Sequence, residues 1–206
     1  RGIKKHMDEM FIAFGRITEF EIKIEEVSEK FFENQDFYLE AEKMVHVQPC
    51  NAYSFVKKGK IRIDKSKLKR HRIAPGKHLQ EIKQGKDIFY NGKRHKFKDL
   101  TFTEEDKKIS FVLDTLMNER IVSFVKNSDA LICESSFHSS LEKLAKEYQH
   151  LTSRQAAEIA RKSKTIKLYL VHLSQRYSRD INKVLQEAKK IFRNSFIPKD
   201  LDTVSV

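Results

Sequence analysis

Three short apolar runs in the second half of the chain each end in a side chain that can bind a metal ion or move a proton. The runs are 109–114 (ISFVLD), 130–134 (ALICE) and 165–177 (TIKLYLVHLSQRY). The side chains at their ends are Asp114, Glu134 and His172, and segments with helical spacing separate the runs. This alternation predicts βαβ units, whose ligands gather beyond the carboxyl ends of the strands. We therefore expect Asp114, Glu134 and His172 to lie close together in space.

Asp114 and His172 each have an ordinary structural interpretation beside a chemical one. An aspartate that closes an apolar strand often caps the next helix, which is predicted to begin near Leu116. A histidine at a strand end can be a core residue that pairs with a backbone carbonyl. A carboxylate and an imidazole can equally well bind a metal ion. Taken alone, Asp114 is better explained as a helix cap, whereas His172 is better explained as a metal ligand.

A second candidate pair combines Glu134 with His150. A buried carboxylate needs a partner, and Glu134 ends an apolar run. Thr152 and Gln155 have the spacing of a capping box for a helix over residues 153–163, so His150 is expected just outside a helix start. The pair is either structural or able to move a proton, and its residues alone do not decide between the two.

The segment 57–98 carries the positive charge of the chain. It has sixteen Lys and Arg residues against three acidic residues, a net charge of +13, whereas the whole chain of 206 residues carries +12. A solvated loop is one interpretation of such a charge run. However, Pro75-Gly76 and Asn91-Gly92 mark turns and many apolar residues accompany them, so we expect an insertion that folds. A folded basic surface suits a polyanion, because each neutralised phosphate releases a counterion.

The remaining elements serve packing. Helical spacing predicts helices over residues 3–14 and 180–192. Alternating and β-branched residues predict strands over 19–27, 37–47 and 52–56, with a last short edge strand over 195–198. The chain has no run of 18 apolar residues and no signal-like segment, so we expect no membrane span.

Length and cysteine content place further bounds. A chain of 206 residues is long enough for one good core and falls in the single-domain range. It opens on Arg1 inside a predicted helix, so we expect a fragment or a truncated chain. Cys50 and Cys133 have no CxxC spacing, which favours a reducing, cytoplasmic setting over a disulfide scaffold.

Four segments form a pattern that goes beyond single residues. They are 110–115 (SFVLDT), 131–137 (LICESSF), 150–152 (HLT) and 171–177 (VHLSQRY). In order and spacing they resemble the second half of ribonuclease Z, the metallo-β-lactamase-fold endonuclease that trims tRNA 3′ ends. The resemblance covers nearly the whole chain. The signature His-x-His-x-Asp-His of that family, which supplies most of its zinc ligands, is expected before residue 1 and is absent from this sequence.

Two further segments are similar to motifs of the same family. Residues 46–53 (HVQPCNAY) resemble its third motif, His-x-x-Pro-x-x-Gly-Tyr, with Ala52 at the position of the glycine. Residues 74–85 resemble the glycine-proline motif of its tRNA-binding arm, with Lys77 where a second proline often stands. The resemblance therefore extends into the basic segment.

The resemblance implies a fold, a metal site and a set of residue roles. The implied fold is a partial α/β metallo-β-lactamase αββα sandwich over residues 1–56 and 99–206, with an inserted basic arm over 57–98. Two zinc ions are implied for the intact enzyme, with ligands here from His46, Asp114 and His172. Catalytic roles are implied for His150, which would protonate the leaving oxygen, and for Glu134 behind it. The expected substrate-binding residues are Ser174, Arg176, Lys67, Lys69, Arg70, Arg72, Lys77 and Lys83.

The function expected from these observations is removal of the 3′ trailer from precursor tRNA by a zinc-dependent endoribonuclease. The resemblance also implies a cytoplasmic homodimer, in which the arm of one subunit holds the tRNA cut by the other. This chain alone is expected to be inactive, because its zinc ligands are too few. Two alternatives stay open: a metallo-β-lactamase-fold phosphodiesterase of another substrate class, and an inactive fragment that binds RNA or forms dimers.

Overall fold

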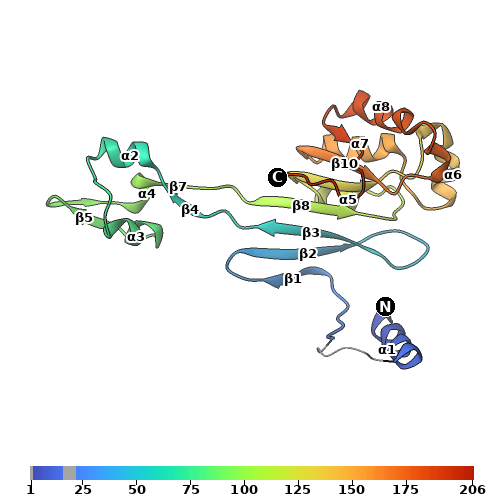
Figure 1. Cartoon of the computed structure of the whole chain (residues 1–206), viewed down its shortest axis with the longest axis horizontal. Helices are drawn as coiled ribbons and strands as arrows, with labels where there is room; N and C mark the ends of the chain where they lie inside the picture. The colour runs from blue at the N-terminus through green and yellow to red at the C-terminus, as the bar shows by residue number, and fades with distance from the viewer. Residues whose placement is uncertain (1, 16–21) are drawn as a thin grey trace. The chain divides into compact units, whose positions relative to one another are not determined.

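The computed structural model describes residues 2–15 and 22–206, which divide into two compact units (Figure 1). The first unit comprises Arg1–Val56 and Lys108–Val206, and the second comprises Lys57–Lys107. Among the described residues, no helix combines the length and the apolar composition needed to cross a bilayer.

The first unit is built on a seven-stranded sheet with the order β1-β2-β3-β8-β9-β10-β11. Strands β8 to β11 are parallel neighbours, and β1 and β2 form an antiparallel pair. The strands of this sheet are β1 (Glu29–Glu33), β2 (Phe37–Lys43), β3 (Asn51–Lys57), β8 (Lys107–Val112), β9 (Ala130–Glu134), β10 (Lys167–Val171) and β11 (Ser195–Phe196). The helices and 3-10 turns of the unit are α1 (Ile3–Phe14), α5 (Glu119–Phe124), η1 (Ser139–Leu141), α6 (Glu142–Glu147), α7 (Ser153–Lys162), η2 (Gln175–Tyr177) and α8 (Ile181–Ile191).

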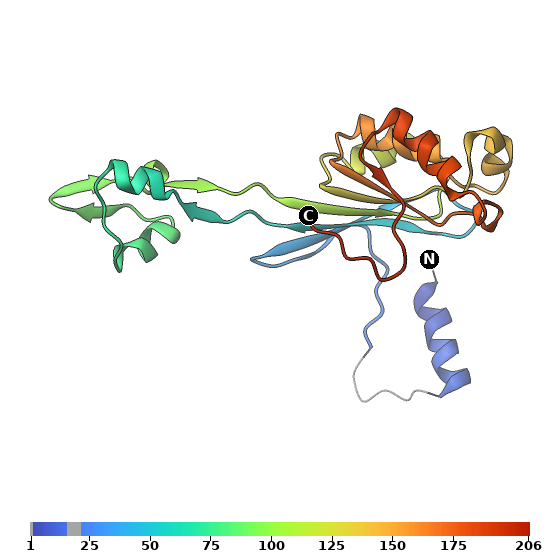
Figure 2. The same cartoon turned by 45° about the horizontal axis from the view of Figure 1, so that its top comes forward.

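Helices cover one face of this sheet. Figure 2 shows α7 and α8 side by side above strands β8 to β10. Leu131, Leu168 and Leu170 point into the layer between sheet and helices and are fully buried, and each contributes about 1.5–3 kcal/mol by burial. The facing side of α7 consists largely of alanines, and such small side chains let the helix lie close to the strands. This packing fixes the carboxyl ends of the strands, where the candidate site lies.

The opposite face of the sheet carries large apolar side chains that remain partly in solvent. Tyr53 is 44% exposed, Phe111 42% and Phe196 43%, and they alternate along their strands with buried residues. A sheet face of this composition is typical of one that packs on a second sheet. The described residues thus supply one sheet and one helical layer of the αββα arrangement.

The helices predicted from spacing are confirmed. α1 has the predicted bounds and ends at Gly15, whose φ of 72° lies in the left-handed region. α7 begins at Ser153 with the predicted capping box, since Thr152 and Gln155 each accept from the backbone N–H of the other. α8 spans Ile181–Ile191, within one residue of the predicted range at each end.

The strand predicted over 19–27 is wrong for residues 22–27, which form no strand, while 19–21 lie outside the described residues. The first strand is β1 instead, and it pairs with β2 through a turn that Asn34 closes. The side-chain oxygen of Asn34 accepts hydrogen bonds from the backbone of Asp36 and Phe37 at 2.8 and 2.9 Å. Such local bonding of an asparagine side chain sets a turn, so turn chemistry decided which residues pair.

A buried carboxylate ties α8 to the segment after β9. Glu187 accepts hydrogen bonds from the hydroxyls of Ser139 and Ser153, and from the backbone N–H of Ser139 at 3.1 Å. His138 Nε2 lies 3.3 Å from the same carboxylate. Burial works to raise the pKa of Glu187, but the bonds from Ser139 and Ser153 outweigh it and leave this pKa below its ordinary value.

The second unit is a small folded domain, and the expectation that the basic segment folds is met. Leu68, Ile73, Ile82, Ile88 and Leu100 form its core. The segment expected to end at residue 98 continues to Lys107, because β7 pairs with β4. The elements of the unit are β4 (Ile61–Ile63), α2 (Lys65–Arg70), α3 (His78–Lys83), β5 (Ile88–Tyr90), β6 (Lys93–His95), α4 (Phe97–Leu100) and β7 (Thr101–Thr103).

The two chain segments that enter and leave the second unit pass close to each other at Gly59. A Cβ on Gly59 would lie 1.8 Å from the carbonyl oxygen of Glu104, so only glycine fits there. Beside it, the backbone N–H of Glu104 donates to Lys60 O at 3.0 Å. The ends of the unit are therefore adjacent in space.

Candidate metal centre

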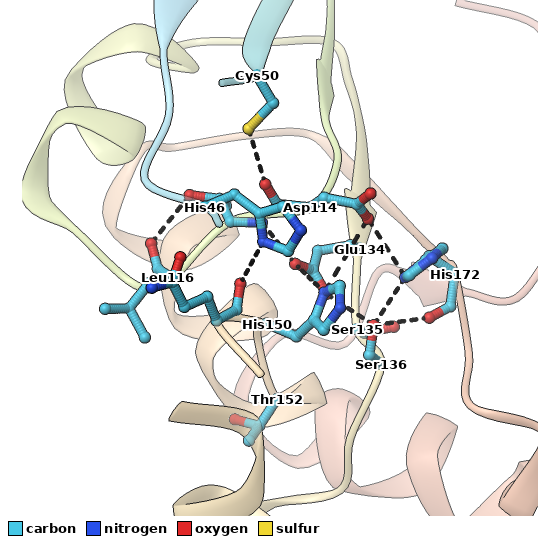
Figure 3. A network of polar contacts seen from close by, with 12 residues as sticks. His46, Cys50, Asp114, Leu116, Glu134, Ser135, Ser136, His150, Thr152 and His172 are labelled. Carbon is cyan, nitrogen blue, oxygen red and sulfur yellow. Dashed lines mark hydrogen bonds and ion pairs between the residues drawn. The ribbon is translucent and has the colours of Figure 1, made fainter. Parts of the chain in front are cut away.

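The parallel register brings the ends of β8, β9 and β10 to one edge of the sheet. Val112 pairs with Cys133, and Glu134 pairs with Val171. Asp114 follows β8 by two residues, Glu134 is the last residue of β9, and His172 follows β10 directly. The proximity that the sequence predicted for these three side chains is present in the structure (Figure 3).

Asp114, His150 and His172 form a cluster of metal-binding groups. Each residue offers one ligand atom, and these three atoms lie within 4.8 Å of one another. Asp114 Oδ1 is 3.5 Å from His172 Nδ1 and 4.0 Å from His150 Nδ1. Two imidazoles and a carboxylate are a donor set that zinc uses.

The oxygen at the centre of this cluster has no hydrogen-bond partner among the described residues. Asp114 Oδ1 is shielded from solvent and makes no hydrogen bond, and the nearest histidine nitrogen is His172 Nδ1 at 3.5 Å. A buried carboxylate oxygen without a donor costs free energy. A cation held between Asp114 and the two rings would satisfy it, so these residues fit a metal ion.

Glu134 lies behind the cluster, fully buried, and accepts from three groups. The backbone N–H of Thr115 donates to Oε1 at 2.7 Å, the Ser136 hydroxyl donates to Oε2 at 2.8 Å, and His150 Nδ1 lies 3.0 Å from Oε1. Three hydrogen-bonding groups offset the free-energy cost of burying the Glu134 carboxylate. Glu134 therefore fixes the ring of His150 and the loop that carries Asp114.

Ser136 and Thr115 are site residues that the sequence interpretation missed. The Ser136 hydroxyl lies 2.8 Å from His172 Nδ1 and also 2.9 Å from the backbone oxygen of His172. The Thr115 hydroxyl lies 3.3 Å from the backbone N–H of Val45, which joins the Asp114 loop to the loop of His46. Their only sequence signal is a hydroxyl one or two residues after a candidate carboxylate.

His46 lies beside the cluster and does not share its ligand atoms. Its Nδ1 pairs with the backbone oxygen of Gln149 at 3.1 Å, and its ring centroid is 5.1 Å from that of His150. The His150 ring is also 5.1 Å from the ring of His172. Of the three predicted ligands, the structure thus brings Asp114 and His172 together with His150 and places His46 one ring away.

Cys50 contacts the same loop through its thiol. Its Sγ donates to the backbone oxygen of Asp114 at 3.0 Å. Burial raises the pKa of the Cys50 thiol, and the nearby carboxylates of Asp114 and Glu134 raise it further. The group is therefore a thiol and not a reactive thiolate near neutral pH, and it supports the backbone of Asp114.

Two cluster residues have left-handed backbone conformations. Asp114 has φ of 23° and His172 has φ of 54°. Residues other than glycine adopt such angles at a cost, and they occur often at functional sites. Both strand ends are thus turned sharply at the residue that faces the cluster.

The expected substrate-binding residues occupy two different settings. In the first unit, Arg176 is exposed, donates from Nε to the Ser174 hydroxyl at 3.0 Å, and has its guanidinium carbon 5.2 Å from the Phe137 ring centroid. In the second unit, Lys67 is half-buried and donates from Nζ to Thr101 O at 2.8 Å. The other expected substrate-binding residues of the second unit are all exposed: Lys69, Arg70, Arg72, Lys77 and Lys83.

Similarity to solved structures defines the class of fold. The short form of human tRNase Z matches with a TM-score of 0.51 and 18% identity, over 85% of this chain and 46% of that one. The metallo-β-lactamase-fold protein YhfI from Bacillus subtilis matches with a TM-score of 0.51 and 16% identity, over 80% of this chain and 46% of that one. The first unit therefore has the metallo-β-lactamase fold.

Similarity to known sequences defines the family more narrowly. Ribonuclease Z of Oceanobacillus iheyensis is 33% identical over 213 residues, covering 100% of this chain and 69% of that protein. Ribonuclease Z of Nanoarchaeum equitans is 30% identical over 204 residues, covering 99% of this chain and 64% of that protein. No family model matches the chain. The chain belongs to the ribonuclease Z family and spans 59–69% of the length of the first three curated relatives it matches.

Proposed function

We propose that the protein carrying this chain is a zinc-dependent endoribonuclease that removes the 3′ trailer from precursor tRNA in the cytoplasm. Membership of the ribonuclease Z family supports the reaction class. The observation that carries the proposal is the unpartnered Asp114 oxygen between the rings of His150 and His172. An oxygen so placed is suited to a cation.

Asp114 and His172 would hold the metal, and His46 would serve as a further ligand from the adjoining loop. When bound, zinc would activate the attacking water and stabilise the charge that develops on the phosphate oxygens. Two zinc ions in open sites need about seven or eight protein contacts counting a bridging ligand. The three side chains here are too few, so we expect this chain alone to bind zinc weakly and to cleave no tRNA.

His150 would protonate the leaving oxygen, and Glu134 would hold it for that task. Because an ionised carboxylate only accepts, the His150 nitrogen at 3.0 Å from Glu134 must carry a hydrogen. That leaves Nε2 of His150 as the nitrogen that can take up and deliver a proton. General acid catalysis of this kind contributes about 10²–10⁴-fold in rate.

The second unit would bind the body of the tRNA. Its seventeen Lys and Arg residues against seven acidic ones give it a net charge of +10. Each phosphate neutralised by a lysine or arginine releases a counterion, which yields affinity without sequence preference. In the first unit, Ser174 and Arg176 would hold the phosphate or the acceptor end. We also propose a homodimer in which the second unit of one subunit holds the tRNA cut by the other.

Metal content and cleavage, measured together on the complete protein, test this proposal. The substrate is a 3′-extended precursor tRNA under single-turnover conditions, and zinc is determined by elemental analysis. The complete protein should cleave to a tRNA with a 3′-hydroxyl, and Asp114→Ala should lose both zinc and cleavage. The exposed carboxylate variant Asp200→Ala is the matched control and should keep both. Full cleavage by Asp114→Ala or by the chelator-treated protein would contradict the proposal.

A further inference from the structure

The buried carboxylate of Glu134 reaches two histidines by two routes. It contacts His150 directly, at 3.0 Å from Oε1 and 3.2 Å from Oε2. It reaches His172 through the Ser136 hydroxyl, which lies 2.8 Å from Glu134 Oε2 and 2.8 Å from His172 Nδ1 (Figure 3). Ser136 is 4% exposed, so water does not replace these partners.

The hydrogens in the Glu134–Ser136–His172 network have one favourable arrangement. The Ser136 hydroxyl has one hydrogen and three neighbours: Glu134 Oε2, the His172 backbone oxygen at 2.9 Å, and His172 Nδ1. The two oxygens can only accept, so the hydroxyl hydrogen belongs to one of them. If it pointed at Nδ1 instead, both oxygens would face the lone pairs of Ser136, whereas a hydrogen on one oxygen leaves only the other so placed. In the favoured arrangement, His172 Nδ1 carries a hydrogen and donates to Ser136.

We propose that Ser136 is a positioning residue that extends the influence of Glu134 to His172 and holds this ring in its Nδ1–H tautomer. One carboxylate then sets the tautomers of both histidines. The Nδ1–H groups face Asp114 Oδ1 at 3.5 Å for His172 and 4.0 Å for His150, and the Nε2 lone pair of each ring stays free for a metal ion or a proton. The inference rests on the proposed function, because fixing the tautomer matters if the ring binds a metal ion. Its geometry stands without that function.

Long-range proton–nitrogen correlation spectra of the metal-free complete protein test the tautomer directly. In the wild-type protein, His172 should show hydrogen on Nδ1. In Ser136→Ala, which removes the hydroxyl, His172 should populate the Nε2–H tautomer, while His150 should keep hydrogen on Nδ1. Ser136→Thr retains a hydroxyl and should restore the wild-type spectrum. If Ser136→Ala does not fold, the wild-type spectrum still decides, since an Nε2–H tautomer there would overturn the proposal.

A matched control and a second measurement separate positioning from general damage. Ser135 is the adjacent buried serine, and its hydroxyl donates to the backbone oxygen of Val171 at 3.4 Å. Ser135→Ala should leave the His172 tautomer and zinc affinity unchanged. Ser136→Ala should weaken zinc binding by about 10–100-fold in competition with a chelator. An unchanged tautomer in Ser136→Ala would refute the proposal. The tautomer readout needs neither zinc nor RNA cleavage, so it still decides the proposal if the proposed function fails.

Discussion

The two units of this chain place their charged groups in opposite settings. In the first unit, Glu134 is fully buried and each of its oxygens meets a fixed donor. In the second unit, charges such as Lys69 on α2 and Lys83 on α3 lie on the exposed surface of two short helices. A reaction requires atoms held to within a fraction of an ångström, whereas affinity for a polyanion follows the number of cations presented. The comparison indicates that single substitutions act strongly in the first unit and weakly in the second.

The largest effect is expected from His150→Ala. Removing the proton donor should lower the single-turnover cleavage rate by about 10²–10⁴-fold while zinc content stays near wild type. His138→Ala is the control, because His138 pairs with Glu187 outside the cluster. Loss of zinc in His150→Ala would instead assign this ring to the ligand set.

Removal of the second unit should affect binding and leave the metal centre intact. Lys60 O already accepts from the Glu104 backbone N–H, so residues 61–103 can be replaced by Asn-Gly to close a two-residue hairpin. We expect tRNA affinity to fall by about two orders of magnitude and its log–log salt dependence to flatten. Zinc content should not change. Equal affinity and equal salt slope in both proteins would refute the assignment of this unit as the tRNA-binding part.

Single lysines within the second unit should differ according to their contacts. Lys69→Met removes an exposed charge and should reduce the salt slope of tRNA binding by about one. Lys67→Met removes the ammonium that donates to Thr101 O, so it should lower the melting temperature and change the slope less. Binding titrations at several salt concentrations, with thermal melts of both variants, distinguish the two residues. A larger change in the salt slope for Lys67→Met than for Lys69→Met would show that Lys67 breaks its bond to Thr101 and contacts RNA.

The smallest effect concerns a carboxylate that the first unit uses for stability. The pKa of Glu187 is lower in the folded chain than its ordinary value of 4.5. Its stabilising contribution is therefore complete above that value and is lost as pH falls through the folded pKa. Glu187→Gln should lower the free energy of unfolding at neutral pH and make it less sensitive to acid. Glu158→Gln removes a carboxylate that lines the same surface pocket as Glu187, and it should keep the wild-type acid dependence.

The sequence predicted the parts of the site that depend on local pattern. The positions of Asp114, Glu134 and His172 at strand ends follow from alternating strands and helices, and the place of His150 follows from its capping box. The hydrogen bonds of Ser136 depend on how the turn after β9 directs a short side chain, and no spacing encodes that direction. The position of His46 depends on the contact of its loop with the Asp114 loop, where Leu116 N–H donates to Val45 O. That contact joins segments far apart in sequence.

In the fold, the same limit applies at the N-terminal strands. Alternation favoured a strand over 19–27, but β1 formed at Glu29–Glu33 because the Asn34 turn presents it to β2. Periodicity identifies residues that can form a strand, whereas a turn and a partner decide which of them do.

The left-handed backbone angles of Asp114 and His172 lower the stability of the fold at the candidate site. Such conformations cost of order 1–3 kcal/mol each in residues other than glycine. A lineage released from the need to cleave would gain stability by placing glycine at either position. Aspartate and histidine therefore persist at these positions only under selection for cleavage, because glycine would be more stable there. Glycine at these two positions would be an early mark of a relative that has lost the activity.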